Sequence, residues 1–392
     1  MAWTRDSTVA WLFGDARSIR DGKRFVEQLG RRMIESGFPL CRLRLGCRII
    51  HPLFGGLSFA WSVDQEGATE VQPDHGYRDR EAYIGSPLQH VSETGERFRR
   101  RTPELVDGRD HRVLFTLAAQ GVTDYLGVPM RMSDGRVAPF VVATKADGGF
   151  TDQEVAECEE LASYVAPVFE TFIVRRLART ILNTYVGPRT GERVLSGQIK
   201  RGDGELINAA IWFSDLRDFT PLTENLEPQA LLDLLNAYFE TVSDAVTARG
   251  GEVLRFIGDA MLIVFPVEGA SSENQACDAA LDAADDAFSG LAALNRRRTR
   301  SQRPTISFGV GLHLGEVIYG NVGARERLDF TVMGPAVNRT ARLESLTKEL
   351  GTPLLMSSQF AQSVSVETRS LGRRAMKGVA GRHEVFAPIS AP

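Results

Sequence analysis

The C-terminal half of the sequence predicts an α+β fold, with helices packed on one side of a mainly antiparallel sheet. Two observations predict it: strand-like apolar runs alternate with helix-period segments, and a Gly-Gly step at 250–251 opens a hairpin that holds Asp259. Strands are expected at 207–213, 305–312 and 317–321, and helices at 229–247, 274–294 and 336–350.

Two acidic residues of this half stand in similar settings, at the edges of short apolar runs. Asp215 follows the run 209–214, and Asp259 precedes the run 261–265. Both runs are typical of buried strands, where an acid is costly unless it is paired, protonated or bound to a cation. Brought together at neighbouring strand ends, the two carboxylates form an oxygen-rich site suited to Mg²⁺ and a polyphosphate.

The N-terminal half predicts a mixed α/β domain over residues 1–167. A helix is expected at 25–34, a strand at 40–51 and a hairpin over 125–144. Thr151 and Glu154 then form a capping box that opens a helix running to about residue 184. We therefore expect a helical linker at 168–204 and a second domain at 205–392, with the boundary in the polar stretch 196–204.

The long helix allows two interpretations. An alternating three-four spacing of apolar residues favours a dimeric stalk that transmits a signal between domains. The alternative is a single amphipathic helix packed on its own domain. The positions with this spacing are Cys158, Leu161, Val165, Val168 and Phe172.

Composition places modest bounds on the function. The 392-residue chain has a formal net charge of -4, which gives no sign of nucleic-acid or anionic-membrane binding. Its four cysteines are scattered, without a Cys-x-x-Cys pair, as in a protein of a reducing cytosol. No apolar stretch approaches the roughly 20 residues that span a bilayer, and the N-terminus lacks a signal-peptide core. These features predict a cytoplasmic protein with no membrane span.

Five segments of the C-terminal half, at 213–220, 255–260, 309–317, 330–342 and 376–378, resemble in order the catalytic domain of class III nucleotidyl cyclases. The resemblance implies a ferredoxin-like βαββαβ fold. It also implies conversion of a nucleoside triphosphate to a cyclic nucleotide and pyrophosphate. The hairpin over 125–144 and the segment 148–154 resemble the end of a GAF-type sensory domain, which implies a GAF-like regulatory domain before the cyclase domain.

The family assigns roles to four of these positions. Asp215 and Asp259 stand where it binds two divalent cations, Mg²⁺ or Mn²⁺. One cation activates the ribose 3′-hydroxyl, and the other holds the triphosphate and neutralises the leaving pyrophosphate. Asn338 and Arg342, which share one helix face, stand where it orients the ribose and stabilises the α-phosphate. The nearby Glu344 is expected on a solvated helix face.

The resemblance to the cyclase family implies a phosphate-binding role for three further positions. Phe219 and Thr220 offer backbone N–H groups at a helix start, and Lys377 corresponds to a lysine that contacts the terminal phosphates. Asp218 departs from the family pattern, which usually has glycine at this position. A carboxylate beside a triphosphate is unfavourable unless it faces away or a metal intervenes.

Base selection rests on Arg255 and Thr331. Adenylate cyclases of the family usually place a lysine where Arg255 stands, and one branch uses a threonine at the position of Thr331. A cationic donor with a threonine fits N1 and the 6-amino group of adenine, which favours ATP as the substrate. Guanylate cyclases place an acid there, but arginine can also donate to guanine O6, so GTP stays the alternative. Arg255 can also be an ion-pairing strand residue that makes no contact with the base.

The resemblance also implies a homodimer with active sites at the subunit interface. In the family, the two acids come from one subunit, and the base-reading, Asn and Arg residues come from the other. One catalytic domain per chain then gives two equivalent sites, whose geometry an unknown small-molecule or protein signal at the N-terminal domain can bias. A different interpretation is a catalytically silent nucleotide- or signal-binding module, because Asp218 and Arg255 depart from the usual pattern.

Overall fold

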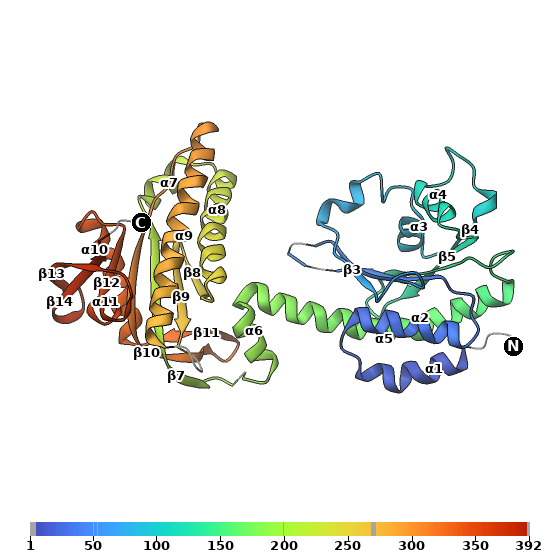
Figure 1. Ribbon diagram of the computed structural model, residues 1–392, viewed down its shortest axis with the longest axis horizontal. Helices are drawn as coiled ribbons and strands as arrows, with labels where there is room; N and C mark the ends of the chain where they lie inside the picture. The colour runs from blue at the N-terminus through green and yellow to red at the C-terminus, as the bar shows by residue number, and fades with distance from the viewer. Residues whose placement is uncertain (1–4, 50, 53, 199, 268–271, 390–392) are drawn as a thin grey trace. The chain divides into compact units, whose positions relative to one another are not determined.

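The computed structural model describes residues 5–49, 51–52, 54–198, 200–267 and 272–389 (Figure 1). The chain divides into two compact units, Met1–Ile181 and Leu182–Pro392. Their boundary falls inside the stretch 168–204, which the sequence analysis assigned to a linker. No helix in the described ranges is both long and apolar enough to cross a membrane.

The first unit is built on a six-stranded antiparallel sheet with the strand order β3-β2-β1-β6-β5-β4. Its strands are β1 (Arg42–Arg48), β2 (Gly56–Ser62), β3 (Thr69–Val71), β4 (Phe98–Arg101), β5 (Asp124–Arg131) and β6 (Val137–Thr144). Its α-helices are α1 (Asp6–Phe13), α2 (Gly22–Glu35), α3 (Pro87–Thr94), α4 (Arg112–Ala119) and α5 (Asp152–Val186), the last of which ends within the second unit.

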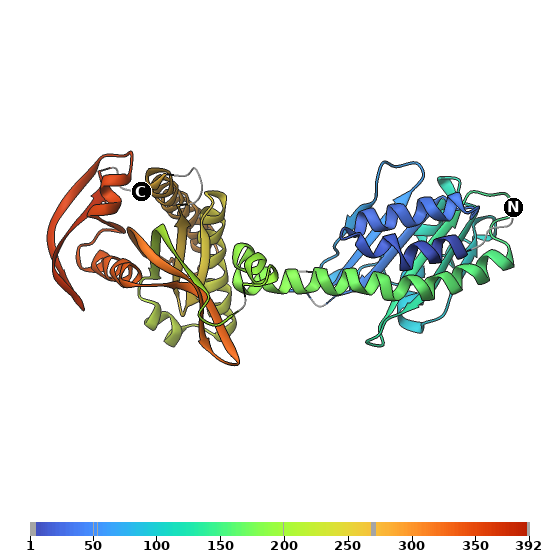
Figure 2. The same ribbon diagram turned by 90° about the horizontal axis from the view of Figure 1, so that it is seen from below.

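Helices cover both faces of this sheet (Figures 1 and 2). On one face, α1, α2 and α5 bury the main apolar core of the unit against the strands. On the other face lie α3 and α4, with a smaller cluster that includes Leu114 and Val141. Successive residues of β1 point to opposite faces, so Leu43 and Leu45 enter the main core while Arg44 points away from it.

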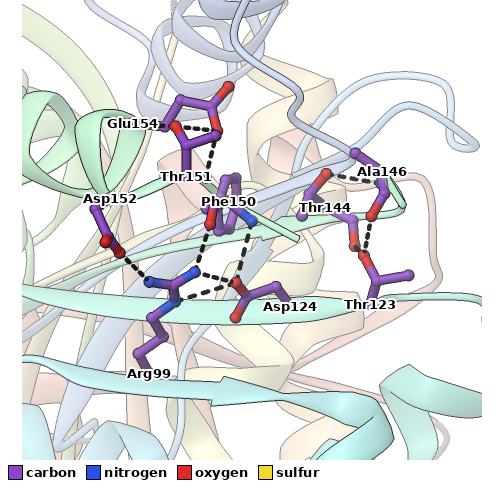
Figure 3. A network of polar contacts seen from close by, with 9 residues as sticks. All are labelled: Arg99, Thr123, Asp124, Thr144, Ala146, Phe150, Thr151, Asp152 and Glu154. Carbon is purple, nitrogen blue, oxygen red and sulfur yellow. Dashed lines mark hydrogen bonds and ion pairs between the residues drawn. The ribbon is translucent and has the colours of Figure 1, made fainter. Parts of the chain in front are cut away.

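The turn before α5 explains the Gly-Gly-Phe sequence at 148–150 (Figure 3). The buried carboxylate of Asp124 accepts hydrogen bonds from Arg99 Nη2 at 2.9 Å and from the backbone N–H of Phe150 at 3.1 Å. Gly149 has a φ of +74°, and a Cβ there would lie 2.6 Å from Asp124 Oδ2. Only glycine combines this conformation with so close an approach.

Helix α5 begins with the predicted capping box, which Figure 3 also shows. The backbone N–H of Glu154 donates to Thr151 Oγ1 at 3.2 Å, and the backbone N–H of Thr151 donates to Glu154 Oε2 at 2.7 Å. The stalk interpretation of the three-four spacing is wrong at the positions that suggested it, because α2 and the sheet already cover them. These residues are buried in the core of their own unit: Cys158, Leu161, Val165, Val168 and Phe172.

The second unit contains an eight-stranded sheet with the order β13-β14-β12-β10-β7-β9-β8, in which β11 also pairs with β10. Its strands are β7 (Gly204–Leu216), β8 (Glu252–Ile257), β9 (Ala260–Pro266), β10 (Phe308–Ala324), β11 (Arg327–Met333), β12 (Leu354–Ser357), β13 (Thr368–Met376) and β14 (Val379–Pro388). Its helices are α6 (Pro188–Leu195), α7 (Phe219–Asn225), α8 (Pro228–Ala248), α9 (Glu273–Arg300), α10 (Pro335–Glu349) and α11 (Ser358–Ser363). All strand pairs are antiparallel except β10 with β12.

One strand of this unit is longer than predicted. The two strands expected at 305–312 and 317–321 are the single strand β10. It pairs with β7 without interruption, from Phe308 opposite Leu216 to Gly320 opposite Gly204. Continuous pairing with a long neighbour keeps the strand intact across the gap that the prediction left between the two segments.

The prediction that helices lie on one side of the sheet holds for α8 and α9 but not for α10 (Figure 1). Val310 and Leu312 of β10 enter the core formed with α8 and α9. The alternate residues, Gly309 and Gly311, point to the opposite face, where α10 packs. A Cβ at Gly311 would lie 2.4 Å from the carbonyl oxygen of Thr340, so the helix approaches this closely only over glycine.

Candidate active site

The two acids singled out in the sequence lie together in the second unit. Asp215 is near the end of the central strand β7, and Asp259 lies in the turn between β8 and β9. Strands β7 and β9 pair with Ser214 opposite Met261, so the register brings the end of β7 beside this turn. The two carboxyl groups are near enough for the charge of Asp215 to affect the protonation of Asp259.

This proximity changes the electrostatics of the pair. Burial raises the pKa of Asp259 to about 6, and the neighbouring carboxyl group of Asp215 acts in the same direction. Two like charges in a partly buried site repel, which favours a proton or a cation between them.

The pair fits a divalent cation that brings a phosphate ligand with it. Carboxylates suit Mg²⁺ and Mn²⁺, and Mg²⁺ is typically held by one or two carboxylates together with substrate phosphates and water. Among the residues that the structure describes, no group of three His, Cys, Asp or Glu side chains forms a protein-only metal site. Asp215 and Asp259 are therefore suited to hold a metal jointly with a substrate.

A buried ion pair beside these acids was missed in the sequence. Arg217 donates from Nη1 to Glu344 Oε1 at 3.1 Å, and its Nη2 donates to Thr347 Oγ1. Glu344, expected on a solvated helix face, is only 4% exposed. Burial raises its pKa to about 7, although Arg217 opposes this shift. The one trace of this pair in the sequence is the glycine at 309. A Cβ at this position would collide with the Arg217 guanidinium, so only glycine leaves room for the ion pair.

Helix α10 presents Asn338 and Arg342 on one exposed face, as their spacing predicts. Its opposite face is buried over the glycines of β10 and against β12 and β14. Neither Asn338 nor Arg342 forms a side-chain hydrogen bond or ion pair with any residue in the described ranges. Both side chains are thus available to a ligand or to another subunit.

The loop after Asp215 accommodates the unexpected Asp218. Asp218 has a φ of +54°, a conformation that glycine adopts freely and aspartate tolerates. Its carboxylate lies 3.4 Å from Nζ of Lys348 on the exposed surface, so it has a cationic partner. Phe219 and Thr220 then open the short helix α7, and the ring of Phe219 packs against the core beneath it.

The two positions assigned to base selection lie on β8 and β11, which are not paired with each other in the sheet, and an acid that the sequence analysis did not consider lies between them in space. Arg255 of β8 forms an ion pair with Asp329 of β11. Thr331 is two residues beyond Asp329, on the same face of β11, and is buried. A cavity of about 660 Å³ opens beside the ion pair and is also lined by residues 183–189 of the linker.

Lys377 stands apart from the two acids in the strand order. It occupies the exposed turn between β13 and β14, at the edge of the sheet away from β8. Its neighbour Met376 packs with Leu343 and Leu346 of α10. Within one chain, Lys377 is therefore close to the helix of Asn338 and is separated from Asp215 by β12 and β10.

Comparisons with known proteins agree with this arrangement. Residues 204–387 match the family model of the adenylate and guanylate cyclase catalytic domain. Adenylate cyclase 1 of Rhizobium meliloti is 34% identical over 181 residues, which cover 45% of this chain and 27% of that protein. An adenylate cyclase of Anabaena cylindrica is 33% identical over 171 residues, which cover 43% of this chain and 33% of that protein.

Among solved structures, a bacterial light-regulated adenylyl cyclase aligns with a TM-score of 0.50 at 23% identity, covering 68% of this chain and 84% of that chain. The adenylyl cyclase CyaB from P. aeruginosa aligns with a TM-score of 0.44 at 27% identity, covering 48% of this chain and 97% of that chain. The first of these alignments shows a shared fold.

The second unit is therefore similar, over residues 204–387, to the adenylate and guanylate cyclase catalytic domain. The resemblance seen in the five sequence segments is confirmed for this domain. The chain spans about a third or less of the length of the two curated relatives named above.

Proposed function

We propose that this chain is an adenylate cyclase that converts ATP to 3′,5′-cyclic AMP and pyrophosphate. The proximity of Asp215 and Asp259, which the pairing of β7 with β9 brings about in a region that matches the cyclase family model, carries this proposal. A pair of partly buried, mutually repelling carboxylates needs a cation, and a nucleoside triphosphate with Mg²⁺ or Mn²⁺ supplies both the cation and its remaining ligands.

The reaction needs little covalent participation by the protein. The ribose 3′-oxygen bonds to the α-phosphorus, the bond from that phosphorus to the β-phosphate oxygen breaks, and the 3′-hydroxyl proton leaves to solvent. Asp215 and Asp259 would hold two divalent cations, which when bound would supply activation of the 3′-hydroxyl and neutralisation of the triphosphate. Arg342 stabilises charge on the α-phosphate, and Asn338 orients the ribose. The reaction rate depends mainly on how the protein positions the reacting groups, because a displacement of about 1 Å can cost roughly 100-fold in rate.

The remaining predicted residues bind the two ends of the nucleotide. The backbone N–H groups of Phe219 and Thr220 and the ammonium group of Lys377 bind the terminal phosphates. Arg255 and Thr331 face the base, where a cationic donor and a hydroxyl suit adenine. The names of the two curated relatives, both adenylate cyclases, support the same choice.

GTP is the alternative substrate, and one contact favours it. Asp329 stands on the same strand face as Thr331 and pairs with Arg255. An acid in this position can accept hydrogen bonds from N1–H and the 2-amino group of guanine, while Arg255 donates to O6. Product formation from ATP and GTP in parallel, first with Mg²⁺ and then with Mn²⁺, separates the two choices: cyclic GMP alone would overturn the choice of ATP.

The active site is proposed to form between two copies of the chain. Asn338 and Arg342 lie on the exposed face of α10, and Lys377 is two strands removed from the strand of Asp215. A two-fold homodimer brings the acids of one subunit to these three residues of the other and yields two equivalent sites.

Mixing two inactive variants tests the shared site. Asp259→Asn removes a metal ligand, and Arg342→Ala removes the phosphate-binding cation. In a mixed dimer, one site carries both changes and the other carries neither. A refolded equimolar mixture is therefore expected to recover about a quarter of the wild-type activity. If each variant is inactive and the mixture is inactive although mixed dimers form, the shared site is wrong.

The N-terminal unit is proposed to be a GAF-like regulatory domain. Its six-stranded antiparallel sheet, with helices on both faces, and the Gly-Gly-Phe turn before α5 support this proposal. Absence of any product with a correctly formed dimer, with and without the first unit's ligand, would favour a catalytically silent binding module instead.

A further inference from the structure

A cavity of about 530 Å³ lies in the first unit, on the face of the sheet opposite the main core. Strands β1 and β2 form its floor, and the segment between β3 and α3 covers it. Two glycines keep the floor open. A Cβ at Gly46 would lie 3.1 Å from Ser58 Cβ, and a Cβ at Gly56 would lie 3.2 Å from Pro73 Cγ. The volume is in the range of about 300–1,000 Å³ that is typical of small-molecule sites.

The walls of this cavity are strongly cationic. Five arginines line it, whereas Glu93 is the only acid among the described residues that line it. Three of the arginines are neutralised by ion pairs with nearby acids: Arg78 with Glu93, Arg80 with Asp74, and Arg136 with Asp134. The other two, Arg44 and Arg48, form no ion pair within the part of the chain that the structure describes. The cavity therefore carries uncompensated positive charge.

Arg44 is the more buried of these two cations. Its Nη2 donates to Ser58 Oγ at 3.1 Å, while its Nε is buried without a hydrogen-bond partner. Burial lowers the pKa of Arg44 from its ordinary value. A partly buried cation with one neutral partner and a buried, unpartnered N–H group is unfavourable unless an anion reaches it. Strand alternation places Arg44 here, since its neighbours Leu43 and Leu45 fill the main core.

We propose that this cavity binds a small organic anion, whose carboxylate or phosphate group pairs with Arg44. The planar fork of a guanidinium donates two parallel hydrogen bonds to either group. Arg48, exposed at the rim, adds a second positive charge. Tyr77, Tyr83 and Pro139 provide aromatic and apolar walls for the body of the ligand. The site lies wholly within the first unit, so the inference does not depend on the proposed cyclase activity.

Isothermal titration calorimetry of the full chain tests the proposal with four probes: benzoate, phenyl phosphate, inorganic phosphate and neutral benzamide. One or both organic anions are expected to bind at one site per chain, and the tighter one identifies the acidic group. Inorganic phosphate binds more weakly because it lacks the apolar body, and benzamide does not bind because it lacks the charge.

Two cavity variants and one surface variant sharpen the test. Arg44→Met weakens binding of the preferred anion by about 10- to 100-fold, the range expected for one charge-assisted pair. Arg48→Gln, a change at an exposed position, weakens binding several-fold. Arg24→Gln removes a positive charge from the exposed side of α2 and leaves binding unchanged.

Four outcomes would overturn the proposal. Neither organic anion binds the wild-type chain; Arg44→Met binds as tightly as the wild type; or inorganic phosphate binds as tightly as phenyl phosphate. The fourth is a lower thermal midpoint of Arg44→Met in anion-free buffer, which would mean that the folded protein itself satisfies Arg44. The proposal predicts an equal or higher midpoint, because the substitution removes an uncompensated buried charge.

Discussion

The hydroxyl of Tyr319 donates a hydrogen bond of 2.8 Å to the carboxylate of Glu252, and both side chains are buried. The other carboxylate oxygen of Glu252 accepts hydrogen bonds from the backbone N–H and the hydroxyl of Thr190, at 3.2 and 3.1 Å. Glu252 begins β8, the strand of Arg255, and Thr190 belongs to the linker helix α6. A single carboxylate therefore ties the linker to a strand of the candidate active site.

Loss of this carboxylate should loosen the linker. We expect Glu252→Ala to destabilise the second unit by about 3 kcal/mol, because buried donors of Thr190 and Tyr319 lose their acceptor. Glu252→Gln keeps an acceptor oxygen and costs about 1 kcal/mol. Denaturant midpoints and hydrogen exchange in α6 measure both effects. Glu240→Ala, at an exposed acid of α8, is the matched control; a midpoint for Glu252→Ala equal to that of the control would contradict the prediction.

The Arg217–Glu344 pair predicts a pH-dependent effect. The pKa of Glu344 is raised to about 7 even with Arg217 present, and removal of Arg217 raises it further. An acid with a raised folded-state pKa loses stability as pH rises through that value. Arg217→Gln should therefore cost more stability at pH 8, about 2 kcal/mol, than at pH 6, where Glu344 takes up a proton.

The exposed ion pair of Lys348 with Asp218 provides the control for Arg217→Gln. Lys348→Gln breaks the surface contact with Asp218, and we expect it to change the denaturation midpoint by no measurable amount at either pH. A deficit of Arg217→Gln that is the same at pH 6 and pH 8 would show that the charge of Glu344 does not matter. Glu344→Gln should abolish the pH dependence of the deficit.

Features governed by local pattern could be predicted from the sequence. The start of the long helix follows from the capping box at Thr151, and its predicted end at about residue 184 lies close to the end of α5 at Val186. The meeting of Asp215 and Asp259 was also predictable, because each acid borders a run with the apolar pattern of a central strand. Antiparallel pairing of β7 and β9 then leaves these two ends side by side.

Features governed by long-range packing could not be predicted in this way. Glu344 has the sequence context of a surface residue, and only the approach of α10 to Gly309 and Gly311 buries it. The ion pair of Arg255 with Asp329 depends on contact between strands far apart in the sequence. The apolar spacing in α5 fits a dimer seam and a domain core equally well, so the pattern alone could not choose between them.

His313 should make the second unit sensitive to acid. Its ring is buried, its Nδ1 lies 2.7 Å from Ser357 Oγ, and burial lowers its pKa to about 4, with Arg339 acting in the same direction. The unfolded chain binds a proton near pH 6.5, so this contribution to stability is complete above that pH and is lost as pH falls towards 4. Between pH 7 and pH 5 we expect a loss of about 2 kcal/mol.

Two histidine variants isolate this contribution. His313→Gln should flatten the acid side of the stability profile measured by thermal unfolding, even though it lowers stability at pH 7. His383→Gln, at a partly exposed position near the C-terminal hairpin, should leave the profile unchanged. Parallel acid profiles for the wild type and His313→Gln would rule out His313 as the cause.

Asp259→Asn should separate stability from activity. The variant removes one of two mutually repelling carboxyl groups, so without metal we expect it to be more stable than the wild type by about 1 kcal/mol, a gain limited by solvent screening. With Mn²⁺ and nucleotide, the wild-type midpoint should rise and that of the variant should not, while product formation falls at least 100-fold. Chelation of the metal should return the wild type to its lower midpoint.

Glu224→Gln, at an exposed acid of α7, should keep wild-type activity and the wild-type response to metal. Full activity of Asp259→Asn would overturn the assignment of the acidic pair to cation binding.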